Sequence, residues 1–140
     1  MRFWDSSALV PLLVVEAATR ELQDLYREDD QVLVWWAAAV ECTSALARRE
    51  RTGGSADLIA LGLERLRELE SRWQEAGPVE AVRHTARRLV RVHGLRAADG
   101  FQLAAALVAS EERPATLDLV TLDDRLAVAA SREGFAVLPG

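Results

Sequence analysis

Short apolar segments alternate with longer segments of helical periodicity along the chain. The apolar segments predict strands at residues 3–4, 31–36, 117–121 and 135–138. Strands that are separated by helices need crossover connections, which join parallel strands and place helices on both faces of the sheet. The pattern therefore predicts an α/β fold with three layers, α/β/α, around a central parallel sheet of about four or five strands.

The stretches between these strands carry apolar residues at helical spacing. After a first helix that Ser6 and Ser7 would cap, helices are predicted at residues 17–27, 37–51, 79–93, 99–110 and 124–132. A further helix is predicted to start at Ser55, run past Trp73 and end at Gly77-Pro78. Asp99 is expected to open the helix that follows Gly94, since a glycine after a periodic segment is typical of a helix end.

Composition narrows the class of protein. A chain of 140 residues fits one domain, so residues 1–140 are expected to form a single domain. All 17 basic residues are arginine, which excludes chemistry that needs a lysine, such as a Schiff base or a P-loop. Cys42 is the only cysteine, and no secretion signal or membrane-spanning segment is evident, so we expect a cytoplasmic protein with no membrane contact.

Four acidic residues lie where solvation of a surface does not explain them. Asp5 and Asp123 each follow a predicted strand, Asp99 opens a predicted helix, and Glu41 is flanked by apolar residues. The carboxyl ends of parallel strands meet at one edge of the sheet, where ligands bind. Taken separately, each acid could also have a purely structural role. Asp5 and Asp99 could cap helices. Glu41 could pair with Arg48, and Asp123 could belong to a turn.

The chemistry of clustered carboxylates favours a cation site. Two carboxylates about 4 Å apart repel by roughly 4 kcal/mol at an effective dielectric constant near 20, so a cluster must protonate or bind a cation. Oxygen ligands favour Mg²⁺ or Mn²⁺. A divalent cation activates water and stabilises the charges that develop when a phosphodiester is cleaved.

With these acids in view, the chain resembles the PIN domain, and within it the VapC-like ribonuclease toxins of bacterial toxin–antitoxin pairs. The matching segments are residues 3–10, 40–48, 93–106 and 119–127, in the family's order and over nearly the whole chain. The chain departs from the pattern in three places. Gly100 replaces the usual alanine, Gln102 stands where histidine is frequent, and residues 11–15, which begin with Pro11, replace a more polar stretch.

The resemblance implies a Mg²⁺-dependent endoribonuclease, with Mn²⁺ as a possible substitute. It implies that Asp5, Glu41 and Asp99 are catalytic metal ligands and that Asp123 is the fourth acid, acting directly or through water. The positions of Ser6 and Thr121 match small hydroxyl residues that support such a site. Asp118 and Asp124 are rival candidates for the fourth acid. The implied partners are an RNA substrate, a cognate VapB-like antitoxin and a second copy of the chain in a homodimer.

Other chemically notable residues each have a simpler interpretation. Residues 79–98 hold five arginines and a single glutamate, so Arg87, Arg91 and Arg96 could bind RNA phosphates or merely solvate a helix face. His84 and His93 lack the spacing of a helical metal pair and are expected at the surface. Cys42 is expected to be a buried thiol. Most tryptophans should lie in the core, while one or two, or residues 12–15, could serve an interface.

Two other classes of protein are alternatives to a ribonuclease toxin. A phospho-accepting receiver domain is also small, α/β and Mg²⁺-binding, but it uses a lysine that this chain lacks. A PIN fold that has lost catalysis and only binds partners is the main alternative, although the presence of all four acids argues against it.

Overall fold

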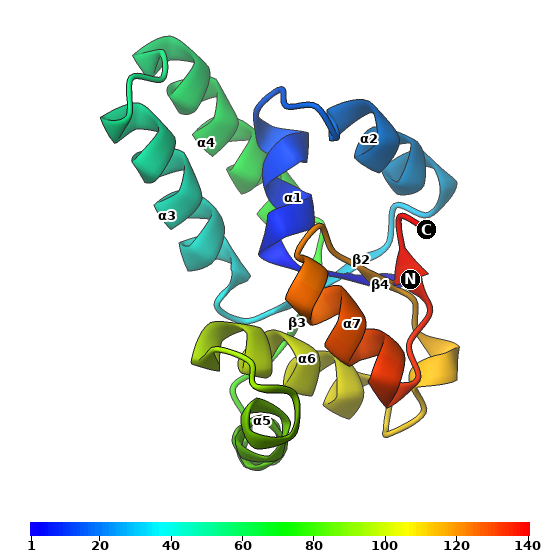
Figure 1. The fold of residues 1–140 in the computed structure, drawn as a ribbon. Helices are drawn as coiled ribbons and strands as arrows, with labels where there is room; N and C mark the ends of the chain where they lie inside the picture. Colours follow the sequence, from blue (N-terminus) through cyan, green and yellow to red (C-terminus); the bar gives the residue numbers. More distant parts are fainter.

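A computed structural model describes residues 1–140, which form a five-stranded parallel sheet with helices on both faces (Figure 1). The strand order is β3-β2-β1-β4-β5, and every pair of neighbouring strands is parallel. The strands are β1 (Arg2–Trp4), β2 (Val32–Trp35), β3 (Gln74–Ala76), β4 (Leu119–Val120) and β5 (Val137–Leu138). The predicted α/β class and the parallel sheet are therefore confirmed.

Seven α-helices and one short 3-10 helix at Pro114–Thr116 connect the strands. The helices are α1 (Ser6–Leu13), α2 (Thr19–Glu28), α3 (Ala38–Arg51), α4 (Ala56–Glu70), α5 (Glu80–His93), α6 (Ala97–Ala109) and α7 (Asp124–Glu133). Figure 1 shows α1 to α4 on one side of the sheet and α5 to α7 on the other.

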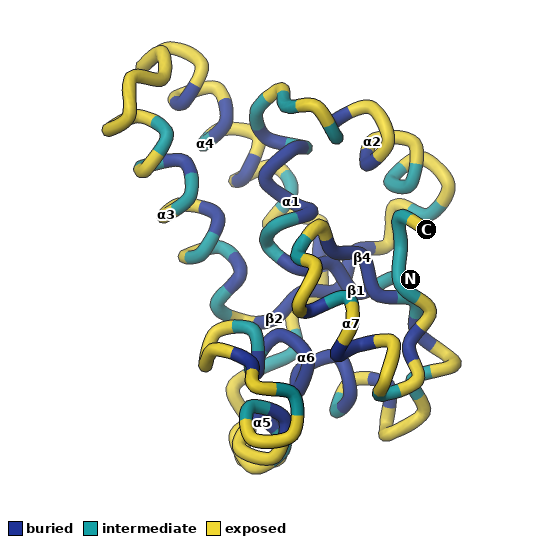
Figure 2. Tube along the Cα trace, in the orientation of Figure 1, coloured by how far each residue is buried: buried dark blue, intermediate teal, exposed yellow.

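Alternation along the strands divides the apolar residues between two cores, because successive side chains of a strand point to opposite faces. Phe3 and Leu119 pack with the helices α5 to α7, whereas their neighbours Trp4 and Val120 pack with α1 to α4. β2 is buried on both faces, and Figure 2 shows β2, β4 and much of α6 as buried. A strand buried on both faces is expected at the centre of a parallel sheet.

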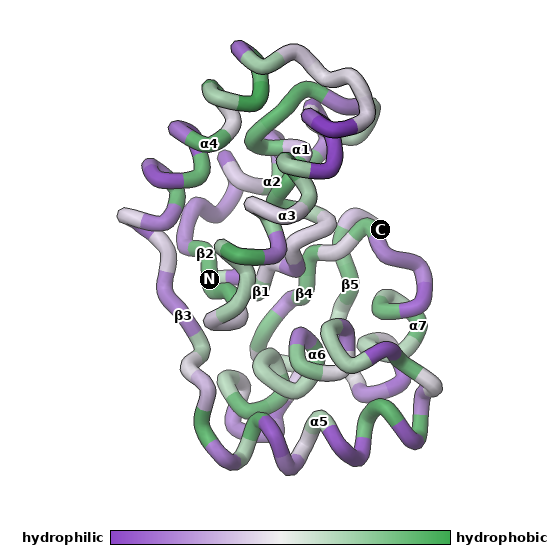
Figure 3. The backbone as a smooth tube through the Cα atoms, turned by 90° about the vertical axis from the view of Figure 1, so that its left-hand side faces the viewer, coloured by the Kyte–Doolittle hydropathy of each residue, from purple (hydrophilic) through white to green (hydrophobic).

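Strand β3 was not predicted from the sequence, and the prediction that its residues belong to a helix ending at Gly77-Pro78 is wrong, because α4 ends at Glu70. The strand pairs only with β2, through the register Val34↔Glu75, and lies at the edge of the sheet. Gln74 and Glu75 are exposed, and Figure 3 shows the hydrophilic character of this segment. A polar strand at a sheet edge carries no apolar alternation, so the hydropathy pattern could not reveal it.

Two predicted helix starts are corrected. Asp5, rather than Ser6 or Ser7, is the N-cap of α1, and its side chain accepts a hydrogen bond from the Ser7 backbone. Helix α6 begins at Ala97 after Arg96, so Asp99 lies within its first turn instead of opening it.

None of the helices combines the length and apolarity that a membrane span would need.

Candidate active site

The carboxyl ends of β1 and β4 bring together residues that are more than a hundred positions apart. Trp4 and Val120 are partners in the parallel ladder, so Asp5 and Thr121 follow at the same edge of the sheet. The Asp5 backbone also donates to the Val120 carbonyl at 3.0 Å. The predicted meeting of strand ends is therefore present, and it places Asp5 beside the segment that carries Asp123.

The two oxygens of Asp5 have unequal surroundings. Oδ2 accepts hydrogen bonds from Ser7 Oγ at 2.5 Å, Thr121 Oγ1 at 2.9 Å and the Ser7 backbone at 3.4 Å. Oδ1 accepts only a long contact of 3.5 Å from Ser6 Oγ. The carboxylate is thus fixed through Oδ2, while Oδ1 keeps lone pairs for a ligand.

Ser7 is the closer supporting hydroxyl, although Ser6 was the residue singled out from the sequence. The Ser7 hydroxyl donates to Asp5 and also accepts a hydrogen bond from the Leu122 backbone at 3.0 Å. A serine two residues after a helix-capping aspartate is the available sequence signal, because its hydroxyl and its backbone N–H both face the cap.

Asp123 lies at the same edge of the sheet, next to Thr121. Its backbone donates to Thr121 Oγ1 at 3.0 Å, and its Oδ1 accepts from the Leu126 backbone at 2.9 Å, which caps α7. Of its rivals, Asp118 precedes β4 and faces Arg2 at 3.7 Å, and Asp124 is exposed in the first turn of α7. The charge of Asp123, and of neither rival, acts on Asp5 and Asp99.

Glu41 lies in the first turn of α3 and contacts α6. Its Oε1 accepts a hydrogen bond of 2.5 Å from Nε2 of Gln102, a buried residue of α6. Arg48, the ion-pair partner considered from the sequence, is exposed and forms no ion pair with Glu41. Burial raises the pKa of Glu41 to about 7, the Gln102 hydrogen bond opposes this, and the charges of Asp5 and Asp99 add to it.

The acids influence one another electrostatically. Burial raises the pKa of Asp5, against the hydrogen bonds from Ser7 and Thr121, and the charge of Asp123 raises it further. Burial also raises the pKa of Asp99, with added contributions from Asp123 and Asp5. None of the four predicted acids forms an ion pair. Carboxylates that are desolvated and mutually repelling, without a paired cation, form a site suited to an added cation.

The donor chemistry of this site suits a hard divalent cation, because every candidate ligand is a carboxylate oxygen. The four acids do not, however, form a group of three or more side chains already arranged to hold a metal ion. The fit is therefore one of chemistry and electrostatics, and these side chains would have to move to close around a cation.

Basic residues occur near Asp99 and on the exposed face of α5. The charges of Arg96 and Arg125 lower the pKa of Asp99, so both lie within electrostatic reach of it. Arg125 was not singled out from the sequence. Arg87 and Arg91 are exposed on α5 and line an open depression of about 590 Å³ together with His84, Arg88 and Val92. Figure 3 shows the hydrophilic and hydrophobic residues alternating along α5.

Four residues outside the acidic site have structural roles. His93, expected at the surface, is instead largely buried and contacts Glu133 at 2.7 Å, and Arg88 binds the same carboxylate at 2.9 Å. These contacts tie the end of α5 to the end of α7. Cys42 is buried as predicted, and burial raises the pKa of its thiol to about 12, which leaves it unreactive.

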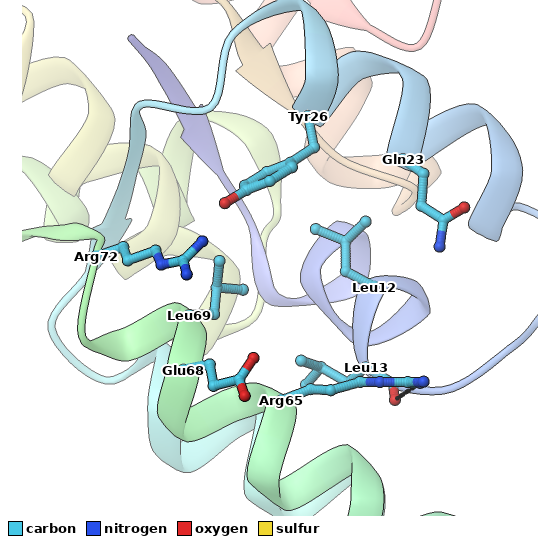
Figure 4. A pocket seen from close by; sticks show the side chains of 8 residues that line it. All are labelled: Leu12, Leu13, Gln23, Tyr26, Arg65, Glu68, Leu69 and Arg72. Atoms are coloured by element: carbon cyan, nitrogen blue, oxygen red, sulfur yellow. Dashed lines mark hydrogen bonds between the residues drawn. The ribbon is translucent and has the colours of Figure 1, made fainter.

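The hollow in Figure 4 is separate from the acids. It lies between α1, α2 and α4, has a volume of about 250 Å³, and includes Leu12, Tyr26 and Arg72 but none of the four acids. Arg65 closes one side by donating to the Leu13 carbonyl at 3.1 Å. The acidic site is therefore distinct from this hollow.

Two ribonucleases of Mycobacterium tuberculosis are similar to this chain. Ribonuclease VapC45 from strain CDC 1551 / Oshkosh is 31% identical over 140 residues, which covers 98% of this chain and 94% of the relative. Ribonuclease VapC49 from strain ATCC 25618 / H37Rv matches with the same identity and coverage. The chain belongs to the VapC ribonuclease family. No family model matches it.

Solved structures share the fold of this VapC-family chain at low sequence identity. PAE2754 from Pyrobaculum aerophilum has a TM-score of 0.69 at 19% identity and covers 97% of this chain and 81% of its own. FitAcB from Neisseria gonorrhoeae has a TM-score of 0.66 at 19% identity, with 98% and 96% covered. A toxin–antitoxin complex from Klebsiella pneumoniae has a TM-score of 0.65 at 15% identity, with 88% and 87% covered. The predicted PIN-like, VapC-family fold is thereby confirmed.

Proposed function

We propose that this protein is the toxin of a VapBC-type toxin–antitoxin pair and acts as a Mg²⁺-dependent endoribonuclease that hydrolyses RNA phosphodiester bonds. Its relatives at 31% identity are named ribonucleases. The observation that carries the proposal is that Asp5 and Asp123 follow adjacent parallel strands, with Glu41 and Asp99 within electrostatic reach of Asp5 and no paired cation. Mn²⁺ is the alternative cation, since it accepts the same oxygen ligands.

Each acid has an oxygen that is free for a ligand. Asp5 would bind through Oδ1, because Oδ2 already accepts three hydrogen bonds. Glu41 would bind through Oε2, because Oε1 accepts from Gln102. Asp99 would be the third ligand, and Asp123, whose Oδ1 caps α7, would contribute Oδ2 directly or through water. A bound divalent cation supplies positive charge and activates water as a nucleophile toward the phosphodiester.

The same edge offers contacts for the RNA. Arg96 and Arg125 lie within electrostatic reach of Asp99, and their guanidinium groups would bind phosphates beside the scissile bond. Arg87 and Arg91, on the exposed face of α5, would bind phosphates further along the strand. The acids then hold the cation, and the arginines hold the substrate.

Metal removal tests the proposal. Purified protein is incubated with a labelled RNA in Mg²⁺, in an excess of EDTA, and in EDTA followed by added Mg²⁺ or Mn²⁺. Cleavage should stop with EDTA and return with either cation, and reaction in H₂¹⁸O should place ¹⁸O in the product phosphate. Cleavage that continues in EDTA contradicts the proposal. An absence of both cleavage and cation binding would instead favour an inactive PIN-fold binding module.

The partners belong to the same proposal. One similar structure is a toxin–antitoxin complex, and another is FitAB bound to a DNA fragment. We propose a VapB-like antitoxin and a homodimer for this chain as well. Two apolar surfaces are available, one where Val15, Leu58 and Leu61 line a groove of about 510 Å³, and one around the exposed Trp36 and Val79. Co-purification with the product of the adjacent reading frame and sedimentation of the isolated chain test these partners.

A further inference from the structure

Gln102 is a buried polar residue whose surroundings within the chain do not satisfy it. Its side chain is only 1% exposed, and it is the one polar side chain among the buried residues of α6. Its amide nitrogen donates to Glu41 Oε1 at 2.5 Å. Its carbonyl oxygen Oε1 is buried and has no hydrogen-bond partner.

An unpartnered buried carbonyl is rare because burial removes water without supplying another donor. In this chain the only other buried side-chain polar atom without a partner is Trp4 Nε1. Turning the Gln102 amide over would bring its oxygen against the Glu41 carboxylate and leave the nitrogen unpartnered, so one end lacks a partner either way. The missing partner must therefore come from outside the polypeptide.

The position of the amide indicates what that partner is. The hydrogen bond to Glu41 holds the Gln102 head group against a carboxylate whose pKa responds to Asp5 and Asp99. Residues that hold a metal ligand in place, and that bind water in the shell around the metal, commonly tune metal sites. Mg²⁺ keeps several of its waters when it binds protein carboxylates, and such a water is a hydrogen-bond donor.

We propose that Gln102 is a positioning residue for a hydrated divalent cation at the acidic site. Its amide nitrogen fixes Oε1 of Glu41 and so leaves Oε2 for the cation, while its carbonyl oxygen accepts a hydrogen bond from a water molecule in that site. The inference rests on the proposed function, because it assigns a role toward the cation that the acids are proposed to bind.

Calorimetric titration with Mn²⁺ tests this role without measuring catalysis. Gln102→Met keeps a similar volume and removes both hydrogen-bonding atoms, so Mn²⁺ binding should weaken about 10–100-fold. Ser110→Ala is the matched control. Ser110 is also a buried polar residue at the end of the same helix, and its hydroxyl donates only to the Leu107 carbonyl. It should bind Mn²⁺ as the wild type does.

Two further measurements separate positioning from a general role in folding. Without cation, Gln102→Met should unfold at or above the wild-type temperature, since it removes an unpartnered buried carbonyl, but it should gain less thermal stability from added Mn²⁺. Gln102→His keeps a donor and an acceptor on one side chain and should bind Mn²⁺ more tightly than Gln102→Met. Weaker binding by the histidine variant would contradict a hydrogen-bonding role.

The outcomes distinguish this inference from the proposed function. If Asp5→Asn weakens Mn²⁺ binding while Gln102→Met binds it as tightly as the wild type, the role of Gln102 is wrong and the cation site stands. If the wild type binds neither Mn²⁺ nor Mg²⁺, both the cation site and the role of Gln102 are overturned.

Discussion

The hydroxyl of Thr121 links two acids of the candidate site. It donates to Asp5 Oδ2 at 2.9 Å and accepts from the Asp123 backbone at 3.0 Å. Since Asp5 follows β1 and Asp123 caps α7, one side chain sets the relative positions of two elements that are far apart in sequence. The site is thus built on the ends of adjacent strands, where the backbone is fixed by the sheet.

Replacing Thr121 with valine should harm both stability and activity. Valine has the same shape but no hydroxyl, so Asp5 loses a donor and the Asp123 backbone loses its acceptor. We expect a loss of about 2 kcal/mol in the free energy of unfolding and slower RNA cleavage. Urea unfolding and a cleavage assay measure these effects. Thr116→Val is the control, because Thr116 is exposed and its hydroxyl donates only to the Arg113 carbonyl. Equal effects from both variants would contradict the role of Thr121 in linking Asp5 to Asp123.

The pKa of Glu41 predicts an unusual dependence of stability on pH. Burial raises this pKa from 4.5 to about 7, so the folded protein holds the proton more tightly than the unfolded chain does. Stability from this group is therefore fully present below pH 4.5, falls as pH rises toward 7, and stays low above it. Glu41→Gln should remove this loss, so its advantage in free energy of unfolding should grow between these pH values.

Urea unfolding at a series of pH values from 4.5 to 8 measures the difference between Glu41→Gln and the wild type. Glu50→Gln is the matched control on the same helix, since Glu50 is exposed, and its difference should stay flat. A flat difference for Glu41→Gln as well would show that the Glu41 carboxylate is not destabilised by burial and by the neighbouring acids.

Gly100 predicts a coupling between α5 and α6. A Cβ at this position would lie 2.4 Å from Cγ1 of Val90, and valine is too stiff at χ1 to move away cheaply. Overpacking costs about 1–3 kcal/mol, whereas alanine gains up to about 1 kcal/mol in helix propensity, so Gly100→Ala should be a net loss. The glycine that departs from the family pattern is thus explained by its neighbour.

A double-mutant cycle measures this coupling. Val90→Ala opens the space that the new methyl group needs, so Gly100→Ala should cost less, or even stabilise, in the Val90→Ala background. Chemical unfolding of the two single variants and the double variant gives the interaction energy. Strictly additive effects would contradict the proposed contact.

The fold was largely predictable because the buried strands are the apolar ones. Val32–Trp35 is buried on both faces, and its hydropathy alone identifies it. Strand β3 was missed because its polar residues form a strand only through pairing with β2. The start of α6 was misplaced because Arg96 occupies the cap position without a side-chain hydrogen bond, so no capping residue marks it.

The candidate site was predictable where it depends on strand ends and not where it depends on helix packing. Asp5 and Asp123 could be expected together, because both follow parallel strands. The contact between Glu41 and Gln102 joins residues 61 positions apart on two different helices, and nothing local encodes it. Ser7 was passed over for Ser6 because the choice between adjacent hydroxyls depends on the exact direction of the first turn of α1.

The central claim is that the four acids form one cation-dependent site for RNA hydrolysis, and Asp5 is the most direct place to test it. Asp5→Asn keeps an oxygen that can cap α1 but removes the charge. Loss of a residue that only supports a metal ligand lowers activity by about 10–100-fold. Asp5→Asn should lower the initial rate of RNA cleavage in Mg²⁺ by more than this, while circular dichroism shows an intact fold. Equal cleavage by the wild type and the folded Asp5→Asn variant would contradict the account.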